Sequence, residues 1–319
     1  MRLIDTHHHF LPDFYAQALE EAGGDPCGWP TPSWSVNGSI NLTENVGSTK
    51  VILSLTAPGA LIAPTNVKRR ALARKANEFA AARRDEDPDR WGFFAALPCL
   101  LDTEGALAEI RYALDILKAD GVTLFTRYGS GNQYLGHPAF KPVWEELNSR
   151  NAVVFVHPTH ACDTTAVNRF LPLPAIDYPH ETTRAAMDMI TTNTKRTYSS
   201  CKVILSHAGG SLPYLISRVS TVSKEAPATA GMFGKSAAEI KEDFRSFYFD
   251  LALSSSEAVL RMVLDLVPHD HILYGSDYPY APSDVIVGFK QILDDVPLDQ
   301  DMREKISYKN AEALFARRD

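Results

Sequence analysis

Short apolar segments rich in β-branched residues alternate along this chain with longer amphipathic segments. Near-continuous apolar runs, such as residues 51–53 and 153–156, are typical of parallel strands covered on both faces. Eight segments of this kind are predicted to be strands: 3–7, 50–56, 91–97, 121–127, 152–157, 202–207, 247–253 and 271–277.

The segments between these strands have the apolar spacing of helices, as in the stripe formed by Leu107, Ile110 and Leu114. Eight strand and helix units predict an α/β fold, a (β/α)8 TIM barrel, as a single domain over residues 1–319. A doubly wound open sheet is the alternative, but no Gly-x-Gly-x-x-Gly follows a predicted strand.

Three irregular segments interrupt this alternation, and the third, residues 223–246, has an Ala/Thr/Gly composition that suggests a surface or subunit contact. Residues 23–34 are rich in Gly, Pro and Trp and follow the first strand, and residues 159–182 follow the fifth. Loops after barrel strands surround the C-terminal mouth, where ligands bind. We therefore expect the first two insertions to contribute to a pocket wall or a lid at that mouth.

Histidines and one aspartate stand at the ends of several predicted strands. His7 and His9 end the first strand and are two residues apart, so both side chains face the same side. His157 ends the fifth strand, His207 the sixth and Asp277 the eighth. A single histidine at a strand end is often only a hydrogen-bonded core residue, but a barrel brings all these ends to one mouth.

This set of side chains predicts a metal site. Three imidazoles and one carboxylate, from His7, His9, His157 and Asp277, suit one divalent ion; Zn²⁺ fits them best, and Mn²⁺ is the alternative because of the oxygen ligand. His207 is then left beside the ion, where it is expected to act as an acid or base on a water or substrate.

Composition limits the function classes. The 32 basic and 39 acidic residues give a net charge of -7 without an extended basic segment, which argues against nucleic acid or an anionic membrane as partner. No apolar run approaches the roughly 18 residues that a membrane span needs. The four cysteines are scattered, so we expect reduced thiols and a cytoplasmic protein.

Several motifs resemble a known family. Asp-x-His-x-His at 5–9, Val-His-Pro at 156–158, His-Ala-Gly-Gly at 207–210 and Gly-Ser-Asp-Tyr-Pro at 275–279 resemble the amidohydrolase superfamily. More narrowly, they are similar to its decarboxylase branch, typified by aminocarboxymuconate semialdehyde decarboxylase, over residues 4–315. Segments 23–29, 55–59 and 155–159 look most like the 6-methylsalicylate decarboxylases of that branch.

The resemblance implies roles for individual residues. It makes His7, His9, His157 and Asp277 the metal ligands, and His207 the catalytic histidine beside them. Arg218 matches an arginine that reaches into the neighbouring subunit's site to hold a substrate carboxylate, which implies a homodimer or a higher homo-oligomer. Without the resemblance, Arg218 would be interpreted as an ordinary arginine on a helix surface.

The resemblance also excludes related chemistries. The end of the fourth predicted strand, residues 123–127, lacks the lysine that becomes carboxylated in binuclear amidohydrolases, so a single metal is expected. Adenosine-deaminase-like members have a glutamate where this chain has Gly210.

The leading functional prediction is therefore decarboxylation of a small ortho-hydroxy aromatic acid, 6-methylsalicylate to m-cresol and CO₂. Protonating the ring carbon that bears the carboxylate would let the phenolic oxygen take up charge, with Asp277 and His207 as the two candidate donors. Phe10, Trp29 and Tyr280 are expected as aromatic pocket walls, although each could equally belong to the core. A hydrolase or hydratase of the same superfamily acting on a lactone or an oxo-diacid, and a silent metabolite-binding barrel, are the alternatives.

Overall fold

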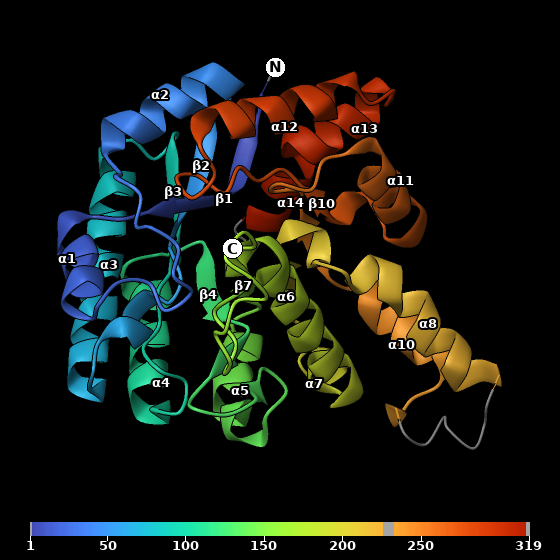
Figure 1. The fold of residues 1–319 in the computed structure, drawn as a ribbon, viewed down its shortest axis with the longest axis horizontal. Helices are drawn as coiled ribbons and strands as arrows, with labels where there is room; N and C mark the ends of the chain where they lie inside the picture. The colour runs from blue at the N-terminus through green and yellow to red at the C-terminus, as the bar shows by residue number, and fades with distance from the viewer. Residues whose placement is uncertain (1, 226–232, 317–319) are drawn as a thin grey trace.

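The structure is a computed structural model that describes residues 2–225 and 233–316. At its centre lie eight parallel strands in the order β1-β2-β3-β4-β7-β8-β9-β10, surrounded by helices (Figure 1). The strands are β1 (Ile4–Phe10), β2 (Lys50–Leu55), β3 (Trp91–Ala95), β4 (Gly121–Phe125), β7 (Val153–His157), β8 (Lys202–Leu205), β9 (Tyr248–Asp250) and β10 (Ile272–Leu273).

The sheet closes on itself between its first and last strands. The backbone N–H of Thr6 donates to the carbonyl of Tyr274 at 3.0 Å, and that of His9 donates to the carbonyl of Tyr278 at 2.7 Å. Closure gives partners to the backbone groups that an edge strand would leave unpaired. Each strand overlaps one predicted segment, so the prediction of a (β/α)8 barrel is confirmed.

Helices cover the outside of the barrel (Figure 1). They are α1 (Asp13–Glu21), α2 (Val36–Val46), α3 (Asn66–Glu86), α4 (Thr103–Arg111), α5 (Lys141–Ser149), α6 (Leu173–Thr191), α7 (Thr194–Thr197), α8 (Leu212–Glu225), α10 (Ala237–Arg245), α11 (Glu257–Leu266), α12 (Ser283–Asp295), α13 (Gln300–Glu304) and α14 (Asn310–Phe315). None of the described helices combines the length and the apolar character that crossing a bilayer requires.

The insertion predicted over residues 159–182 is shorter than expected. Residues 160–172 have no helix or strand, but α6 begins at Leu173, after Pro172, whose fixed φ suits a helix start. A short antiparallel pair, β5 (Arg127–Tyr128) and β6 (Gln133–Tyr134), follows β4 and was not predicted.

The lower part of the barrel interior is an apolar floor. Phe94 on β3 stacks on Phe155 on β7 with ring centroids 5.3 Å apart, and Phe315 from α14 packs against Phe94 at 5.8 Å. Ile4 and Ile52 belong to the same cluster. Burial of each large apolar side chain stabilises the fold by about 1.5–3 kcal/mol, so this floor is a rigid base for whatever lies above it.

A β-bulge in β1 sets which side chains reach the mouth. Asp5 pairs with Val51 and His8 with Leu53, so β1 contains one more residue than β2 between these two pairs. A bulge of this kind shifts the alternation of side chains. Residues an odd number of positions apart on a regular strand face opposite sides, but the bulge changes this in β1. Ile4 therefore faces the barrel axis in the floor, and His7 and His9, three and five residues later, face the same axis at the mouth.

Candidate metal centre and active site

Four side chains from three parts of the barrel converge at its mouth. One donor atom each from His7, His9, His157 and Asp277 lies within 4.8 Å of the other three. The Nε2 atoms of His7 and His9 are 3.1 Å apart, and each is 3.2 Å from Oδ1 of Asp277. Three imidazole nitrogens and a carboxylate oxygen gathered this closely fit one divalent ion.

The second nitrogen of each of these histidines already has a partner. Nδ1 of His7 lies 3.0 Å from Asp250, and Nδ1 of His9 lies 3.0 Å from the Ser54 hydroxyl. The Nδ1 of His157 lies 2.8 Å from the carbonyl of Pro158. The Asp250 carboxylate and the Pro158 carbonyl can only accept, so Nδ1–H of His7 and of His157 donates to them, and the Ser54 hydroxyl can accept from His9 in the same way. These contacts at Nδ1 direct the Nε2 atoms toward the centre, which is the arrangement that a metal ligand requires.

The electrostatics of the cluster follow from burial and from two carboxylates. Burial opposes a charge on His7, but Asp250 and Asp277 outweigh it and raise the pKa of His7 to about 10. Burial lowers the pKa values of His9 and His157. Burial also disfavours the Asp277 carboxylate, but His7 and His9 hydrogen-bond to it and hold its pKa well below the usual range. The site therefore presents the Asp277 carboxylate and the neutral imidazoles of His9 and His157 to a cation, and a bound ion would displace the second proton of His7.

Asp250 is a functional candidate that the sequence analysis missed. Its Oδ2 contacts His7, and its Oδ1 accepts from the backbone N–H groups of His207, at 3.1 Å, and Ala252, at 3.0 Å. It is fully buried at the end of β9. The available signal was a lone carboxylate inside the apolar segment 247–253, because such a charge is rarely buried without a partner.

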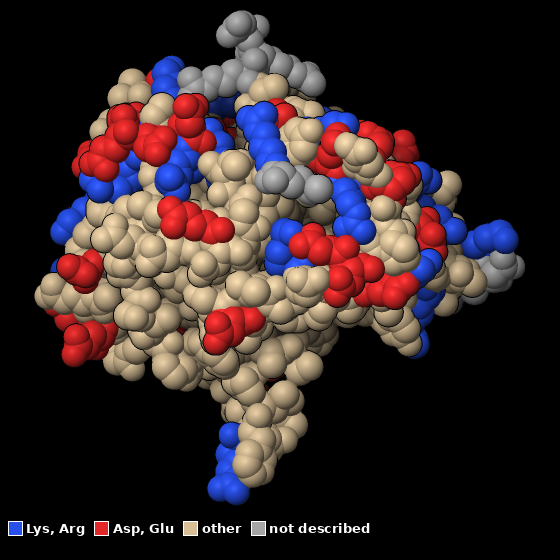
Figure 2. All heavy atoms as spheres, turned by 90° about the horizontal axis from the view of Figure 1, so that it is seen from above, with Lys and Arg blue, Asp and Glu red and all other residues tan. Residues whose placement is uncertain are grey.

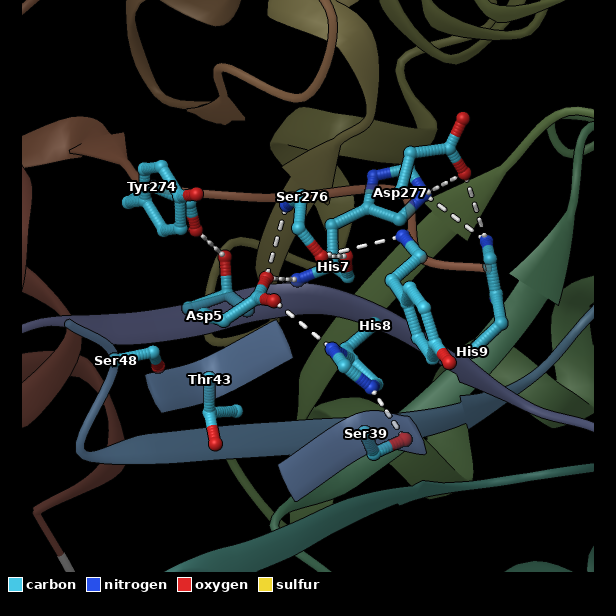
Figure 3. A network of polar contacts seen from close by, with 12 residues as sticks. Asp5, His7, His8, His9, Ser39, Thr43, Ser48, Tyr274, Ser276 and Asp277 are labelled. Carbon is cyan, nitrogen blue, oxygen red and sulfur yellow. Dashed lines mark hydrogen bonds and ion pairs between the residues drawn. The ribbon is translucent and has the colours of Figure 1, made fainter. Parts of the chain in front are cut away.

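A second polar network links β1 to α2 and to the segment after β10 (Figure 3). Asp5 Oδ1 accepts from the backbone N–H groups of His7, at 3.1 Å, and Ser276, at 3.0 Å, and its Oδ2 contacts Nδ1 of His8 at 3.0 Å. The Nε2 of His8 lies 2.9 Å from the Ser39 hydroxyl. His8 thus faces away from the ion site, as alternation along a strand requires, and the network ties β1 to the Asp277 segment.

His207 lies beside the cluster at the end of β8. Its ring centroid is 4.9 Å from that of His7, and its Nδ1 donates to the carbonyl of Ala252 at 3.1 Å. His207 and Ala208 both have left-handed φ values, 54° and 53°, which costs backbone strain of the kind found at functional sites. His207 lines the cavity, and because Nδ1 is held by Ala252, its Nε2 is the ring nitrogen that can meet a ligand.

A cavity of about 340 Å³ opens over the cluster. His9, His157, Asp277 and His207 form its polar side. Most of the remaining wall is apolar and comes from loop 23–34, the start of α6 and the residues around α12. That lining consists of Asp25, Cys27, Trp29, Thr56, Ala57, Pro172, Pro174, Ala175, Tyr178, Pro179, Leu253, Ser254, Tyr280, Ala281, Pro282 and Val285.

Two of the three aromatic residues predicted for the pocket lie in its wall. Trp29 and Tyr280 line the cavity, and the Tyr280 ring meets His9 edge-on at 5.9 Å. Phe10 does not line it and is corrected to a core residue: it is 1% exposed and stacks on Phe79 of α3 at 5.9 Å. The reason is alternation after the bulge, which turns Phe10 outward from the barrel when His9 turns inward.

Arg218 lies on the exposed side of α8 and does not line the cavity of its own chain. This placement is compatible with reaching another copy and equally with a surface arginine. His160 is partly buried, and burial lowers its pKa, while His180 is exposed on α6. Neither is among the cavity lining.

Two further strand ends, those of β4 and β8, border the site without adding ligands to the four-donor cluster. At the end of β4, the Arg127 guanidinium donates to the carbonyls of Gly129, Gly131 and His160, each at 3.0 Å. The Arg127 guanidinium therefore holds the neighbouring loops in place and does not contact the ion cluster. At Gly210 an added Cβ would lie 1.9 Å from the carbonyl oxygen of Pro179, so a glutamate has no room there.

The comparisons with known proteins agree with this geometry. Residues 4–317 match the amidohydrolase family, and the chain belongs to that family. The chain is 49% identical over 317 residues to the 6-methylsalicylic acid decarboxylase of Penicillium expansum, covering 99% of this chain and 97% of that one. It is 50% identical over 319 residues to the 6-methylsalicylic acid decarboxylase of Aspergillus aculeatus, covering 98% and 96%.

Solved structures show the same fold. A protein described as amidohydrolase II superposes with a TM-score of 0.90 at 29% identity, over 99% of this chain and all of that one. A dihydroxybenzoic acid decarboxylase from Polaromonas, solved with manganese and 2-nitroresorcinol, superposes with a TM-score of 0.80 at 22% identity, over 98% and 96%. The predicted family is therefore confirmed.

Proposed function

We propose that this chain is a metal-dependent carboxy-lyase that converts 6-methylsalicylate to m-cresol and CO₂. The observation that carries the proposal is the four-donor cluster at the mouth of the barrel, beneath a largely apolar cavity. The chain that carries it is about half identical to two 6-methylsalicylic acid decarboxylases over its full length. The similarity to both decarboxylases supports the carboxy-lyase class. The particular substrate is proposed from the substrate of these two relatives.

The chemistry explains why such a cavity is useful. Direct loss of CO₂ from an aryl carboxylate would leave an anion in the ring plane, where the π system cannot delocalise it. Protonation of the ring carbon avoids this, because an ortho oxygen takes up the charge and C–C cleavage then restores aromaticity. A divalent ion would supply Lewis acidity toward that oxygen. An apolar wall excludes the water that would otherwise solvate the departing carboxylate.

His7, His9, His157 and Asp277 are proposed as the residues that hold the ion, with Asp250, Ser54 and the Pro158 carbonyl fixing the imidazole rings. Zn²⁺ is the proposed ion because imidazole dominates the donor set, and Mn²⁺ is the alternative, as in the Polaromonas structure.

Two side chains are candidates for delivering the proton, Asp277 and His207. Both line the cavity, and His207 has its Nδ1 fixed by Ala252, so its Nε2 is the atom that would hold or release a proton. Trp29 and Tyr280 are proposed as walls for the flat ring of the substrate.

The assembly proposed is a homodimer or a larger homo-oligomer in which Arg218 of one copy reaches the mouth of another. Arg218 is exposed, and α8 also carries Tyr214, which is 74% exposed. Figure 2 shows a face on which acidic and basic side chains are interspersed above a broad, largely uncharged region that carries isolated acidic groups, a pattern that suits protein contact better than nucleic acid. A single domain over residues 1–319 and a cytoplasmic location remain proposals; the four free cysteines suit the latter.

The test is to incubate the metal-loaded protein with salicylates and resorcylates that differ at the ring position next to the carboxylate, and to measure CO₂ and the phenol released. We expect 6-methylsalicylate to give m-cresol with the highest kcat/KM. Turnover of a lactone or an oxo-diacid without decarboxylation of any salicylate would contradict the proposal. Chelation followed by addition of Zn²⁺ or Mn²⁺ shows whether activity follows the ion.

A further inference from the structure

The cavity is lined by a second acidic side chain besides Asp277. Asp25 lies in the loop 23–34 that follows β1 and is 9% exposed. Its Oδ1 accepts from the backbone N–H of Cys27 at 2.8 Å, and its carbonyl accepts from Gly28 at 2.8 Å. The hydrogen bond from the Cys27 N–H to the Asp25 side chain forms an Asx-turn, which fixes the Asp25 carboxyl group in the cavity wall.

Within the described part of the chain, no permanently cationic side chain lies in the cavity wall with Asp25. Among the described residues that line the cavity, none is a lysine or an arginine. His160 interacts with Asp25, but burial and Arg127 lower the pKa of His160, so its imidazole is neutral at pH 7. This differs from acids elsewhere in the fold, such as Asp102, which accepts two hydrogen bonds from Arg70.

The neighbours of Asp25 in the wall are neutral groups. Burial raises the pKa of the Cys27 thiol to about 12, and it also raises the pKa values of the Tyr178 and Tyr280 hydroxyls. All three therefore remain protonated at neutral pH. Burial raises the pKa of the Asp25 carboxyl group, and hydrogen bonds from the Cys27 N–H and thiol oppose that rise. In its ionised form, the Asp25 carboxylate is the anionic group of a largely apolar wall that a bound ring meets away from the proposed ion site, and charges interact strongly where water is scarce.

We propose that Asp25 is a charge filter, a specificity-determining residue that admits aromatic acids with one carboxylate and rejects those with a second anionic substituent. The inference rests on the proposed function and extends it from the reaction to the choice of substrate. A methyl group on the ring meets no such penalty, whereas a second carboxylate would bring two negative charges into one poorly hydrated space.

The test compares two ligands of nearly the same shape, 2-hydroxyterephthalate and 4-carbamoylsalicylate. They differ only in a second carboxylate that the latter replaces with a neutral amide. Dissociation constants are measured by calorimetry on the metal-loaded protein, so the result does not depend on turnover. The variants are Asp25→Asn, whose amide oxygen can still accept from the Cys27 N–H, and Asp25→Ser, whose hydroxyl can do the same.

We expect Asp25→Asn and Asp25→Ser to tighten the dianion by about tenfold or more relative to the amide. The matched control is Asp284→Asn, which removes an exposed charge at the start of α12, beside the cavity residue Val285. It should change the same ratio by less than about twofold, because solvent and salt screen an exposed charge.

An unchanged or reversed ratio in both Asp25 variants would overturn the filter, as would an equal effect of Asp284→Asn. Wild-type turnover of 6-methylsalicylate, measured on the same preparation, reports separately on the proposed function. Failure of the filter is therefore distinguishable from failure of the activity.

Discussion

The two ends of the barrel interior are built from the same strands but have opposite character. At the floor, Phe94, Phe155 and Phe315 pack into a dry apolar cluster. Two residues beyond Phe155 on the same strand, His157 joins the polar cluster at the mouth, and Ser54 stands in the same relation to Ile52. Stability and chemistry are therefore separated along the axis of the barrel. We expect the floor to determine the free energy of unfolding, and the mouth to determine metal binding and turnover.

The strongest test of this separation is His157→Ala. Loss of one of the four proposed ligands should weaken metal binding by more than about a hundredfold, since loss of a residue that only supports a ligand already costs about 10–100-fold. Metal content after gel filtration is the measurement. Full retention of the ion would contradict the proposed ligand set.

His207→Ala should separate binding from turnover. We expect the metal to be retained and kcat to fall by about 10²–10⁴, the range for removal of a general acid or base. Metal analysis and steady-state kinetics on one preparation check both parts. Loss of the metal here and its retention in His157→Ala would mean that the two roles are exchanged.

Phe94→Ala tests the floor. Its buried ring stacks on Phe155 and contacts Phe315, so the cavity left behind should lower the free energy of unfolding by about 3–5 kcal/mol. Urea unfolding of the metal-free protein measures this change. A large fall in kcat at a temperature where the variant is fully folded would contradict the separation between floor and mouth.

Asp250→Asn tests a residue that acts through others. It keeps the shape but weakens the contact with His7 Nδ1 and with the backbone of His207, so metal affinity or kcat should fall about 10–100-fold. Calorimetric titration with Zn²⁺ measures the first, and kinetics at saturating metal measures the second. The Asp243→Asn variant, which alters a buried acid away from the mouth, is the control for stability.

The pH dependence of metal binding tests the proton on His7. In the metal-free protein, burial disfavours a proton on His7, but Asp250 and Asp277 outweigh burial and raise its pKa to about 10. An incoming ion must displace that proton, so affinity should rise by up to about tenfold per pH unit between about pH 7 and pH 9. The raised pKa also means that stability gained from the protonated His7 is lost as pH rises through about 10. A flat affinity profile would contradict this account.

Much of the barrel could be predicted because its strands are short, apolar and separated by amphipathic helices. The strand-end positions of His7, His157 and Asp277 also followed from the sequence, since only the ends of strands, not their lengths, had to be right. Asp250 was missed because a carboxylate in an apolar segment does not reveal which imidazole it meets. Phe10 was misplaced because aromatic character does not tell the pocket side of a strand from the helix side.

The amino-acid sequence by itself determined the alternation of elements, the donor set and the family motifs, because periodicity and residue type are local properties. Tertiary structure decided the rest. The bulge in β1 allows Ile4 to join the floor while His7 and His9 face the mouth, and strand closure brings Asp277 within 3.2 Å of both histidines. Such outcomes depend on register between distant strands, a quantity that no single segment contains.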